Sequence, residues 1–327
     1  MRSLPRLRVG SMGLLVTALL ACAFAAPMLR DAVFGSAALS TAGTVFCGVF
    51  VQAVPFLVLG VLVSGLIAVF VSPVRLACLL PRRQTLAVMV AGVAGAALPG
   101  CECGSVPVAR RLFGEGGATG AAALTFMLAA PAINPVVMVA TAVAFPDAPA
   151  MVLARMGASL LTASIIGWAW SRWGRPEWIT RRLPASAHRP ESRWVLFAEA
   201  ARHDFLQAAP YLVVGAAAAA ALHVLVPQRV FAYLAGDVAL GVLTMAALAV
   251  VLALCSEADA FVAASMTMVP LLPRLVFLVV GPAVDVKLFA MQAGMFGRAF
   301  ATRFAPCTFV VAVACACAVG FLVLGGA

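Results

Sequence analysis

The stretch "FVQAVPFLVLG" at residues 50–60 returns as "FLQAAPYLVVG" at residues 205–215. A second pair follows in the same order, because "LTFMLAAPAINPVVM" at 124–138 matches "LVFLVVGPAVDVKLF" at 275–289. Similarity that recurs in a fixed order along a chain indicates repeated structural units. The sequence therefore predicts two homologous halves.

The composition places these halves in a membrane. Of 327 residues, 64% are hydrophobic and only 10% are charged, and the mean hydropathy is +1.09. Soluble domains contain about 25% charged residues, and a helix needs about 20 apolar residues to cross a bilayer. We predict an all-α polytopic membrane protein with about 8–10 transmembrane segments. Apolar runs lie at residues 9–29, 44–71, 85–108, 118–145, 150–170, 205–226, 238–269, 275–296 and 305–324.

The distribution of charge sets the expected orientation. The formal net charge is +10, and every basic residue except Lys287 is Arg. Seven Arg lie at 171–204, and all five Trp lie between Trp168 and Trp194. Basic links favour the cytoplasmic side, and Trp favours the membrane interface. This Arg-rich linker is therefore predicted to be cytoplasmic rather than a surface for nucleic acid.

If every apolar run crossed the membrane once, the Arg-rich linker would lie outside the cytoplasm, so one run is predicted not to cross. The best candidate is the run 85–108, which Pro99-Gly100 interrupts and which we interpret as a re-entrant hairpin. The two halves then enter the membrane from opposite sides, so they are predicted to be inverted repeats with broken helices, as in many secondary transporters. The expected segments are a signal-anchor-like N-terminal span at 1–43, repeat 1 at 44–170, the linker at 171–204, repeat 2 at 205–304 and a C-terminal span at 305–327.

Thiols lie at the centre of the predicted hairpin. In "LPGCECGSVP", Cys101 and Cys103 flank Glu102. In the second half, Cys255 corresponds to Cys101. Side chains two residues apart diverge on a helix, so the two thiols converge only if the backbone is broken. Four residues are expected to supply that break: Pro99, Gly100, Gly104 and Pro107. Thiolates suit soft ions such as Cu(I), Zn(II) or trivalent arsenic, so Cys101, Cys103 and Cys255 are predicted to bind a thiophilic substrate. Packing at a tight turn is the alternative.

Four acidic residues fall within or beside apolar runs: Glu102, Glu257, Asp259 and Asp285. An ionised carboxylate costs at least about 2.5 kcal/mol at the centre of a membrane helix, so each needs a use, a partner or a water path. A carboxyl group in apolar surroundings releases its proton less readily than in water. We therefore predict that Glu102, Glu257 and Asp259 couple protons to transport. Structural pairing is the alternative, and it is strongest for Asp285 with Lys287.

Further polar residues occupy equivalent positions in the two halves. Asn134 and Asp285 lie in the breaks "AAPAINP" and "GPAVD", and Gln52 and Gln207 each precede a Pro by three residues. Together with Lys287, they are predicted to line a shared cavity.

The motifs of several enzyme classes are absent from the sequence. It contains no Walker lysine motif, no H-E-x-x-H, no G-x-S-x-G and no C-x-x-C, and it has only three His. We expect neither an enzyme nor a bound cofactor.

Four stretches resemble a known family: "PGCECGSVPVARRL", "LAAPAINPVV", "CSEADAFVAAS" and "GPAVDVKL". They are similar to the predicted-permease family of YraQ-type proteins and ArsP organoarsenical exporters. The resemblance covers residues 50–296. It implies a bacterial-type inner-membrane permease that exports trivalent organoarsenicals or soft metal ions, and relatives of this kind often occur with a second, smaller membrane-associated subunit.

These observations predict an integral-membrane permease that carries out proton-coupled efflux of a soft metal or a trivalent arsenical. The expected partners are the bilayer and a thiophilic ion or small molecule, with a second subunit and a homo-oligomer left open. Two alternatives stay open: a permease for an organic solute, with structural thiols, and a membrane thiol-redox or metal-delivery protein.

Overall fold

The computed structural model describes residues 37–70, 83–97, 102–114, 120–175, 192–225, 238–267 and 269–325. Within these residues every regular element is a helix, which confirms the all-α prediction. The expected N-terminal span at 9–29 and the thiol of Cys101 lie outside the described residues.

The helices of the two halves follow the same order. The first half contains α2 (Ala37–Phe70), α4 (Gln84–Ala94) with a 3₁₀ turn at Gly95–Ala97, α5 (Glu102–Gly114), α6 (Gly120–Ile133), α7 (Pro135–Ala144) and α8 (Ala150–Trp173). The second half contains α9 (Arg193–Leu225), α11 (Val238–Leu252), α12 (Ser256–Ser265), α13 (Leu271–Ala283), α14 (Val286–Met295) and α15 (Arg298–Val323). Each half thus begins and ends with a long helix and holds short helices between them.

Among the described residues, six helical segments are long and apolar enough to cross a membrane: Leu39–Leu66, Gly120–Ala144, Ala150–Trp173, Arg193–Ala221, Leu271–Met295 and Arg298–Val323. Two of them are broken near the middle, where α6 gives way to α7 and α13 gives way to α14. The apolar runs 85–108 and 238–269 are each divided between two shorter helices. These breaks place half-helix ends inside the protein.

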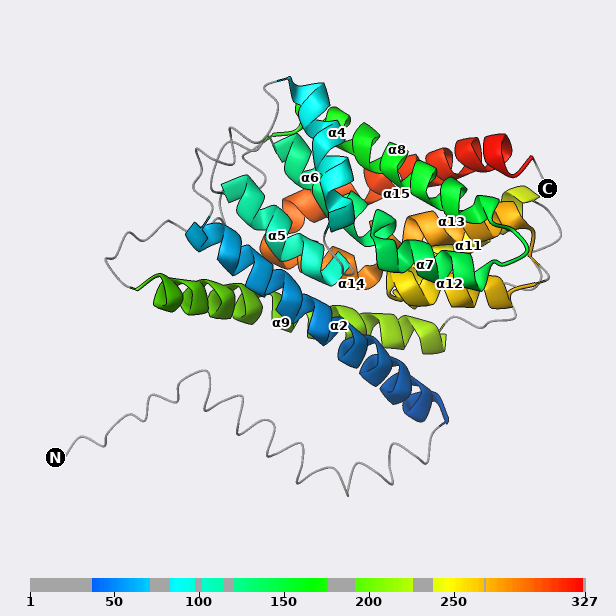
Figure 1. Ribbon diagram of the computed structural model, residues 1–327. Coiled ribbons are helices and arrows are strands. Elements are labelled where there is room, and N and C mark those ends of the chain that lie inside the picture. The colour runs from blue at the N-terminus through cyan, green and yellow to red at the C-terminus, as the bar shows by residue number, and fades with distance from the viewer. Residues whose placement is uncertain are drawn as a thin grey trace.

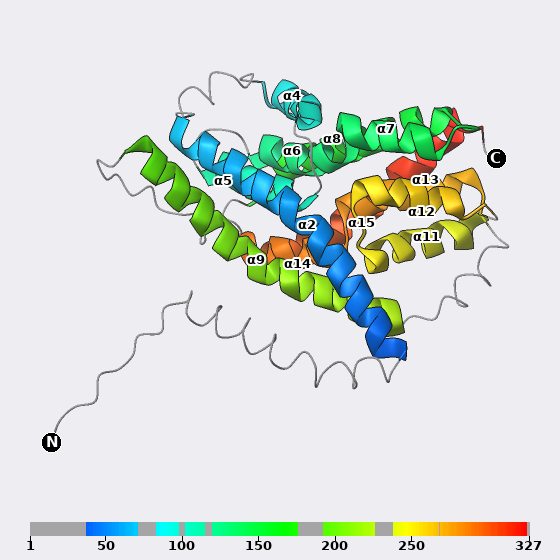
Figure 2. The ribbon, with the colours of Figure 1, turned by 60° about the horizontal axis from the view of Figure 1, so that its bottom comes forward.

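The long helices form the outside of the bundle. Helices α2 and α9 lie side by side and run in opposite directions (Figures 1 and 2). Helices α8 and α15 also pack on each other. The broken span α13–α14 is the most deeply buried of the six candidate spans, so the core of the bundle contains the broken helices.

Two equivalent glycines let half-helices approach the long helices closely. Gly60 of α2 faces Gly104 of α5, and a Cβ at either position would collide with the backbone of the other helix. A Cβ at Gly215 of α9 would lie 2.7 Å from Lys287 Cα on α14. A side chain at Gly60 or Gly215 would push its half-helix away from the long helix, so these repeat positions fix how α5 and α14 are seated.

The prediction that Gly104 and Pro107 break the backbone is wrong, because both lie inside α5. Gly104 is instead a contact residue, since a Cβ there would lie 2.8 Å from Phe56 O of α2. The helix begins at Glu102, and Cys103 therefore lies in its first turn.

Helix α9 begins before its apolar run. The amides of Val195 and Leu196 donate to Ser192 O at 2.9 and 3.1 Å, and Ser is a favoured residue at a helix start. Residues 193–204 of the expected linker are therefore helical.

Candidate functional site

The first turns of three half-helices meet in the interior and join the two halves of the chain. Glu102 is the first residue of α5, Ser256 the first residue of α12, and Lys287 the second residue of α14. Lys287 Nζ lies 2.5 Å from Glu102 Oε1 and 3.8 Å from Asp285 Oδ2. Ser256 Oγ donates to Glu102 Oε2 at 3.4 Å. We call these four residues, together with Arg155, the central cluster.

Arg155 extends this cluster to two further helices. Its side chain, on α8, is fully buried. Its Nη1 donates to Thr141 Oγ1 of α7 at 2.8 Å, and its Nη2 donates to Ser256 O at 2.8 Å. One guanidinium therefore ties α7 to the start of α12.

Two more acidic residues lie in the first turn of α12. Asp259 is buried, and a Cβ at Gly281 would lie 2.6 Å from its Oδ2, so its carboxylate rests against α13. Its charge interacts with that of Arg155. Glu257 is half-buried and interacts with the charges of Glu102 and Arg155. Both acids therefore belong to the same electrostatic environment as the central cluster.

Helix geometry explains how these acids are accommodated. Glu102 lies in the first turn of α5, and Glu257 and Asp259 lie in that of α12. Helix N-termini carry a partial positive charge that favours carboxylates by about 0.3–1 kcal/mol, and by up to about 2 kcal/mol where they are partly buried. The breaks in the helices thus supply positive helix ends where the acids lie.

Asn134 and Asp285 have the equivalence that the repeat predicts. Each is the N-cap of the second helix of a broken span. Asn134 Oδ1 accepts from Val137 N at 3.0 Å, and Asp285 Oδ1 accepts from Leu288 N at 2.5 Å. Both side chains are fully buried. The same local capping therefore restarts the helix in both halves, whereas a role in lining a cavity stays a prediction.

Two of the three predicted substrate thiols lie beside the central cluster. Cys103 and Cys255 are both buried, and both are close enough to Lys287 to interact with its charge. Asp259 N donates to Cys255 O at 3.0 Å, so these two residues lie one helical turn apart at the start of α12. Within the described ranges, no three His, Cys, Asp or Glu side chains are grouped so as to hold a metal ion.

The two predicted glutamines lie on the paired long helices. Gln207 of α9 accepts a hydrogen bond from Arg110 Nη1 of α5, and Gln52 of α2 is half-buried. Arg110 lies eight residues beyond Glu102 on the same helix, which corresponds to a rise of about 12 Å. Gln207 therefore belongs to a polar contact at the far end of α5 rather than to the central cluster. Nearby, Ser64 Oγ donates to Asp204 Oδ2 at 2.6 Å.

Sequence reasoning missed Arg155, Thr141 and the role of Ser256. Arg155 had a usable signal, because a charged side chain inside the apolar run 150–170 carries the same cost as the acids that were singled out. Thr141 and the carbonyl group of Ser256 gave no sequence signal, since a threonine and a backbone carbonyl group are common within apolar helices.

Comparison with known proteins places the chain among permeases. The model of a family described as predicted permease, ArsP_1, matches residues 38–321. The UPF0718 protein YcgR of Bacillus subtilis is 34% identical over 277 residues, which cover 83% of this chain and 93% of that protein. A putative two-component membrane permease complex subunit of Streptococcus mutans is 30% identical over 267 residues, covering 80% of this chain and 88% of that protein. No solved structure matches the chain.

Proposed function

The chain belongs to the ArsP_1 family of predicted permeases, and from that premise we propose that it exports a soft metal ion or a trivalent arsenical in exchange for protons. The observation that carries this proposal is the ion pair between Lys287 and Glu102. It joins the starts of two half-helices from different halves of the chain, and two thiols lie beside it.

The charge balance of the interior supports a role for protons or a cationic cargo. Four carboxylates, on Glu102, Glu257, Asp259 and Asp285, face two cations, Lys287 and Arg155. If all were ionised, negative charge would exceed positive charge in a region where uncompensated charge is costly. Bound protons or a positively charged substrate remove that excess. Glu257 and Asp259 of α12 are the acids that we assign to proton exchange together with Glu102.

We assign substrate binding to Cys103 and Cys255, with Cys101 completing the set. The two described thiols come one from each half, and both are buried. Thiolates hold soft cations and trivalent arsenic more readily than hard ions. The antiparallel packing of α2 and α9 (Figure 2) supports inverted repeats, which is the arrangement that alternating access uses in many secondary transporters.

The test is uptake into everted membrane vesicles, with and without a proton gradient, for zinc, cuprous copper, arsenite and methylarsenite. Cys103→Ser and Cys255→Ser should each abolish gradient-driven uptake of one of these species. Cys47→Ser is the matched control, because Cys47 is exposed on α2, and it should transport like the wild type. Wild-type transport by the Cys101→Ser/Cys103→Ser double variant would refute the thiol assignment.

A permease for an organic solute is the second candidate. Two buried cations and four acids also suit a solute that carries both charges, and the described residues offer no ready group of three metal ligands. In that case Cys103→Ser would be harmless, while Glu102→Gln would still abolish uptake.

A second subunit is a further part of the proposal, because the Streptococcus mutans relative is named as a complex subunit. We place the protein in a bacterial inner membrane with the Arg-rich linker at residues 171–204 on the cytoplasmic side, as its Arg content favours.

A further inference from the structure

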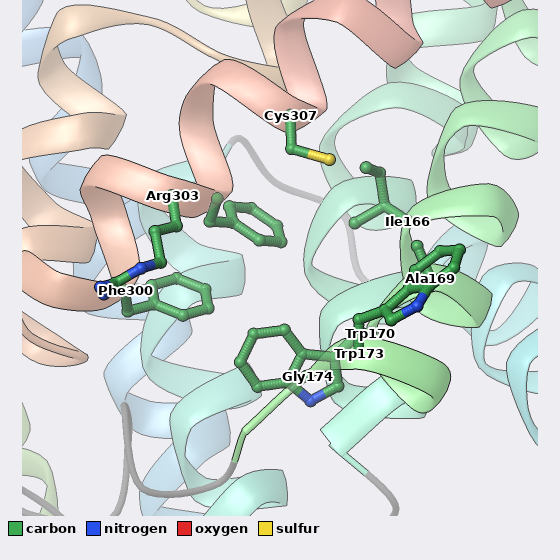
Figure 3. A pocket seen from close by; sticks show the side chains of 9 residues that line it. Ile166, Ala169, Trp170, Trp173, Gly174, Phe300, Arg303 and Cys307 are labelled. Carbon is green, nitrogen blue, oxygen red and sulfur yellow. The ribbon is translucent and has the colours of Figure 1, made fainter.

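We propose that a groove between α8 and α15 binds one anionic phospholipid, with an acyl chain between the two helices and the phosphate at Arg303. This site lies away from the central cluster and does not depend on the nature of the transported substrate. Side chains of both helices face one another across the groove (Figure 3). Its lining includes Trp170 and Trp173 of α8 and Phe300, Arg303, Phe304 and Cys307 of α15.

The groove has room for a segment of an acyl chain, and its walls are apolar. Its volume is about 150 Å³, and a cavity of that volume in an engineered apolar core holds a benzene-sized group. The Phe300 ring packs edge-on against Trp170 at 5.6 Å and stacks on Phe304 at 4.7 Å. These contacts join aromatic rings of α8 and α15 into one wall, so the groove is preformed rather than opened by the ligand.

Charge at the mouth of the groove specifies the headgroup. Arg303 is exposed, and its Nη1 donates to Ala299 O at 2.9 Å, which anchors the side chain at the groove. Three further exposed arginines lie at the same ends of these two helices: Arg172, Arg175 and Arg298. Within the described residues of α8 and α15, no acidic side chain accompanies them. A basic rim around an apolar groove is complementary to a phosphate attached to acyl chains.

The position of the groove favours a lipid over a soluble ligand. Helices α8 and α15 are both candidate membrane spans, and we place the open side of the groove toward the bilayer. Trp173, which lines the groove, is 66% exposed. Trp side chains concentrate at the depth of lipid headgroups. An acyl chain can therefore enter from the bilayer while the phosphate stays at the interface beside Arg303.

The first test is native mass spectrometry of the full-length protein in detergent. The protein is titrated with phosphatidylglycerol and with phosphatidylcholine of the same acyl chains. The wild type should prefer phosphatidylglycerol, and Arg303→Gln should reduce that preference about fivefold, because one arginine near a membrane surface contributes about 1 kcal/mol toward an anionic lipid. Arg193→Gln is the matched control, since Arg193 is an exposed cation at the start of α9. It should keep the preference of the wild type.

The second test reads the groove directly and requires no variant. Cys307 lines the groove and is exposed, and Cys47 is exposed on the distant helix α2. Phosphatidylglycerol should slow maleimide labelling of Cys307 and leave that of Cys47 unchanged, with peptide mapping to separate the two. Equal protection by both lipids would overturn the headgroup assignment. No protection by either lipid would overturn the lipid site and favour a protein partner at this face.

Discussion

Replacing Lys287 by methionine removes the ammonium group between Glu102 and Asp285 and keeps a side chain of similar length. The side chain is buried, and its Nζ lies 2.5 Å from Glu102 Oε1. The substitution therefore leaves a buried carboxylate without its cation. Removing one partner of a buried ion pair costs about 3–5 kcal/mol. Asp285 adds less to this figure, because it is 3.8 Å away and also caps α14.

This free energy converts into a measurable change of the melting temperature. One kcal/mol shifts Tm by about 2–4 °C in chains of intermediate length, and by less in longer ones. With an entropy of unfolding of about 2.1 cal/mol/K per residue, 1 kcal/mol shifts the Tm of this 327-residue chain by about 1.5 °C. Lys287→Met should therefore lower Tm by about 4–7 °C. The assay is size-exclusion chromatography of the detergent-solubilised protein after heating to a series of temperatures.

A double-mutant cycle separates the ion pair from general damage to the core. Glu102→Gln removes the charge that Lys287 balances. The double variant should therefore lose less free energy of unfolding than the two single variants lose in sum, by at least about 1 kcal/mol. Arg202→Met is the control, because Arg202 is an exposed cation on α9, and it should leave Tm unchanged. Strict additivity of the two single losses would refute the claim that this ion pair joins the halves.

Three further predictions follow from the packing. Gly215→Ala should lower both Tm and gradient-driven uptake, since its Cβ would lie 2.7 Å from Lys287 Cα, whereas Gly48→Ala, with nothing within 4 Å of its Cβ, should leave both unchanged. Arg155→Leu should lower Tm by more than Ser64→Ala, because hydrogen bonds to charged groups contribute about 1.5–3 kcal/mol each. Arg155 makes two at 2.8 Å, whereas Ser64 makes one to the charged Asp204 at 2.6 Å and a long one to Pro107 O at 3.5 Å. At saturating substrate, Ser64→Ala should transport at the rate of the wild type in the vesicle assay. A transport defect as large as that of Arg155→Leu would instead show that the contact between Ser64 and Asp204 is functional.

The sequence predicted the features that depend on local pattern. The repeat placed Asn134 and Asp285 at equivalent positions in the two breaks, where both cap the second helix of a broken span, because equivalent segments keep equivalent backbone. Hydropathy located the apolar runs that became the spans. The interruption near Pro99-Gly100 was placed within a few residues of the observed end of the 3₁₀ turn at Ala97, since Pro and Gly act on the backbone where they stand.

The features that depend on contacts between distant segments were not predicted. The partner of Lys287 was expected to be Asp285, two residues away, yet the shorter distance is to Glu102. Gly104 and Pro107 were expected to break the backbone because both residues disfavour helices in isolation. In the folded chain, Gly104 is retained in α5 by close contact with Phe56 O of α2, and tertiary packing of this kind overrides local propensity.

The two halves close the same contact in two different ways. Helix α5 packs on α14, and their counterparts in the opposite halves, α12 and α7, also pack together. The first contact is made by Glu102 and Lys287, whose repeat counterparts are Ser256 and Val136, and these cannot form an ion pair. The second contact is made instead by Arg155 of α8, which donates to Thr141 of α7 and to Ser256 O of α12.

Each contact therefore contains one buried cation, supplied from a different helix. Because the acid that pairs with Lys287 comes from the first half and Lys287 itself from the second, two identical copies of either half would lack this pair. The shared order of helices positions the half-helices, and the residues that differ between the two halves supply the charges that hold the centre together.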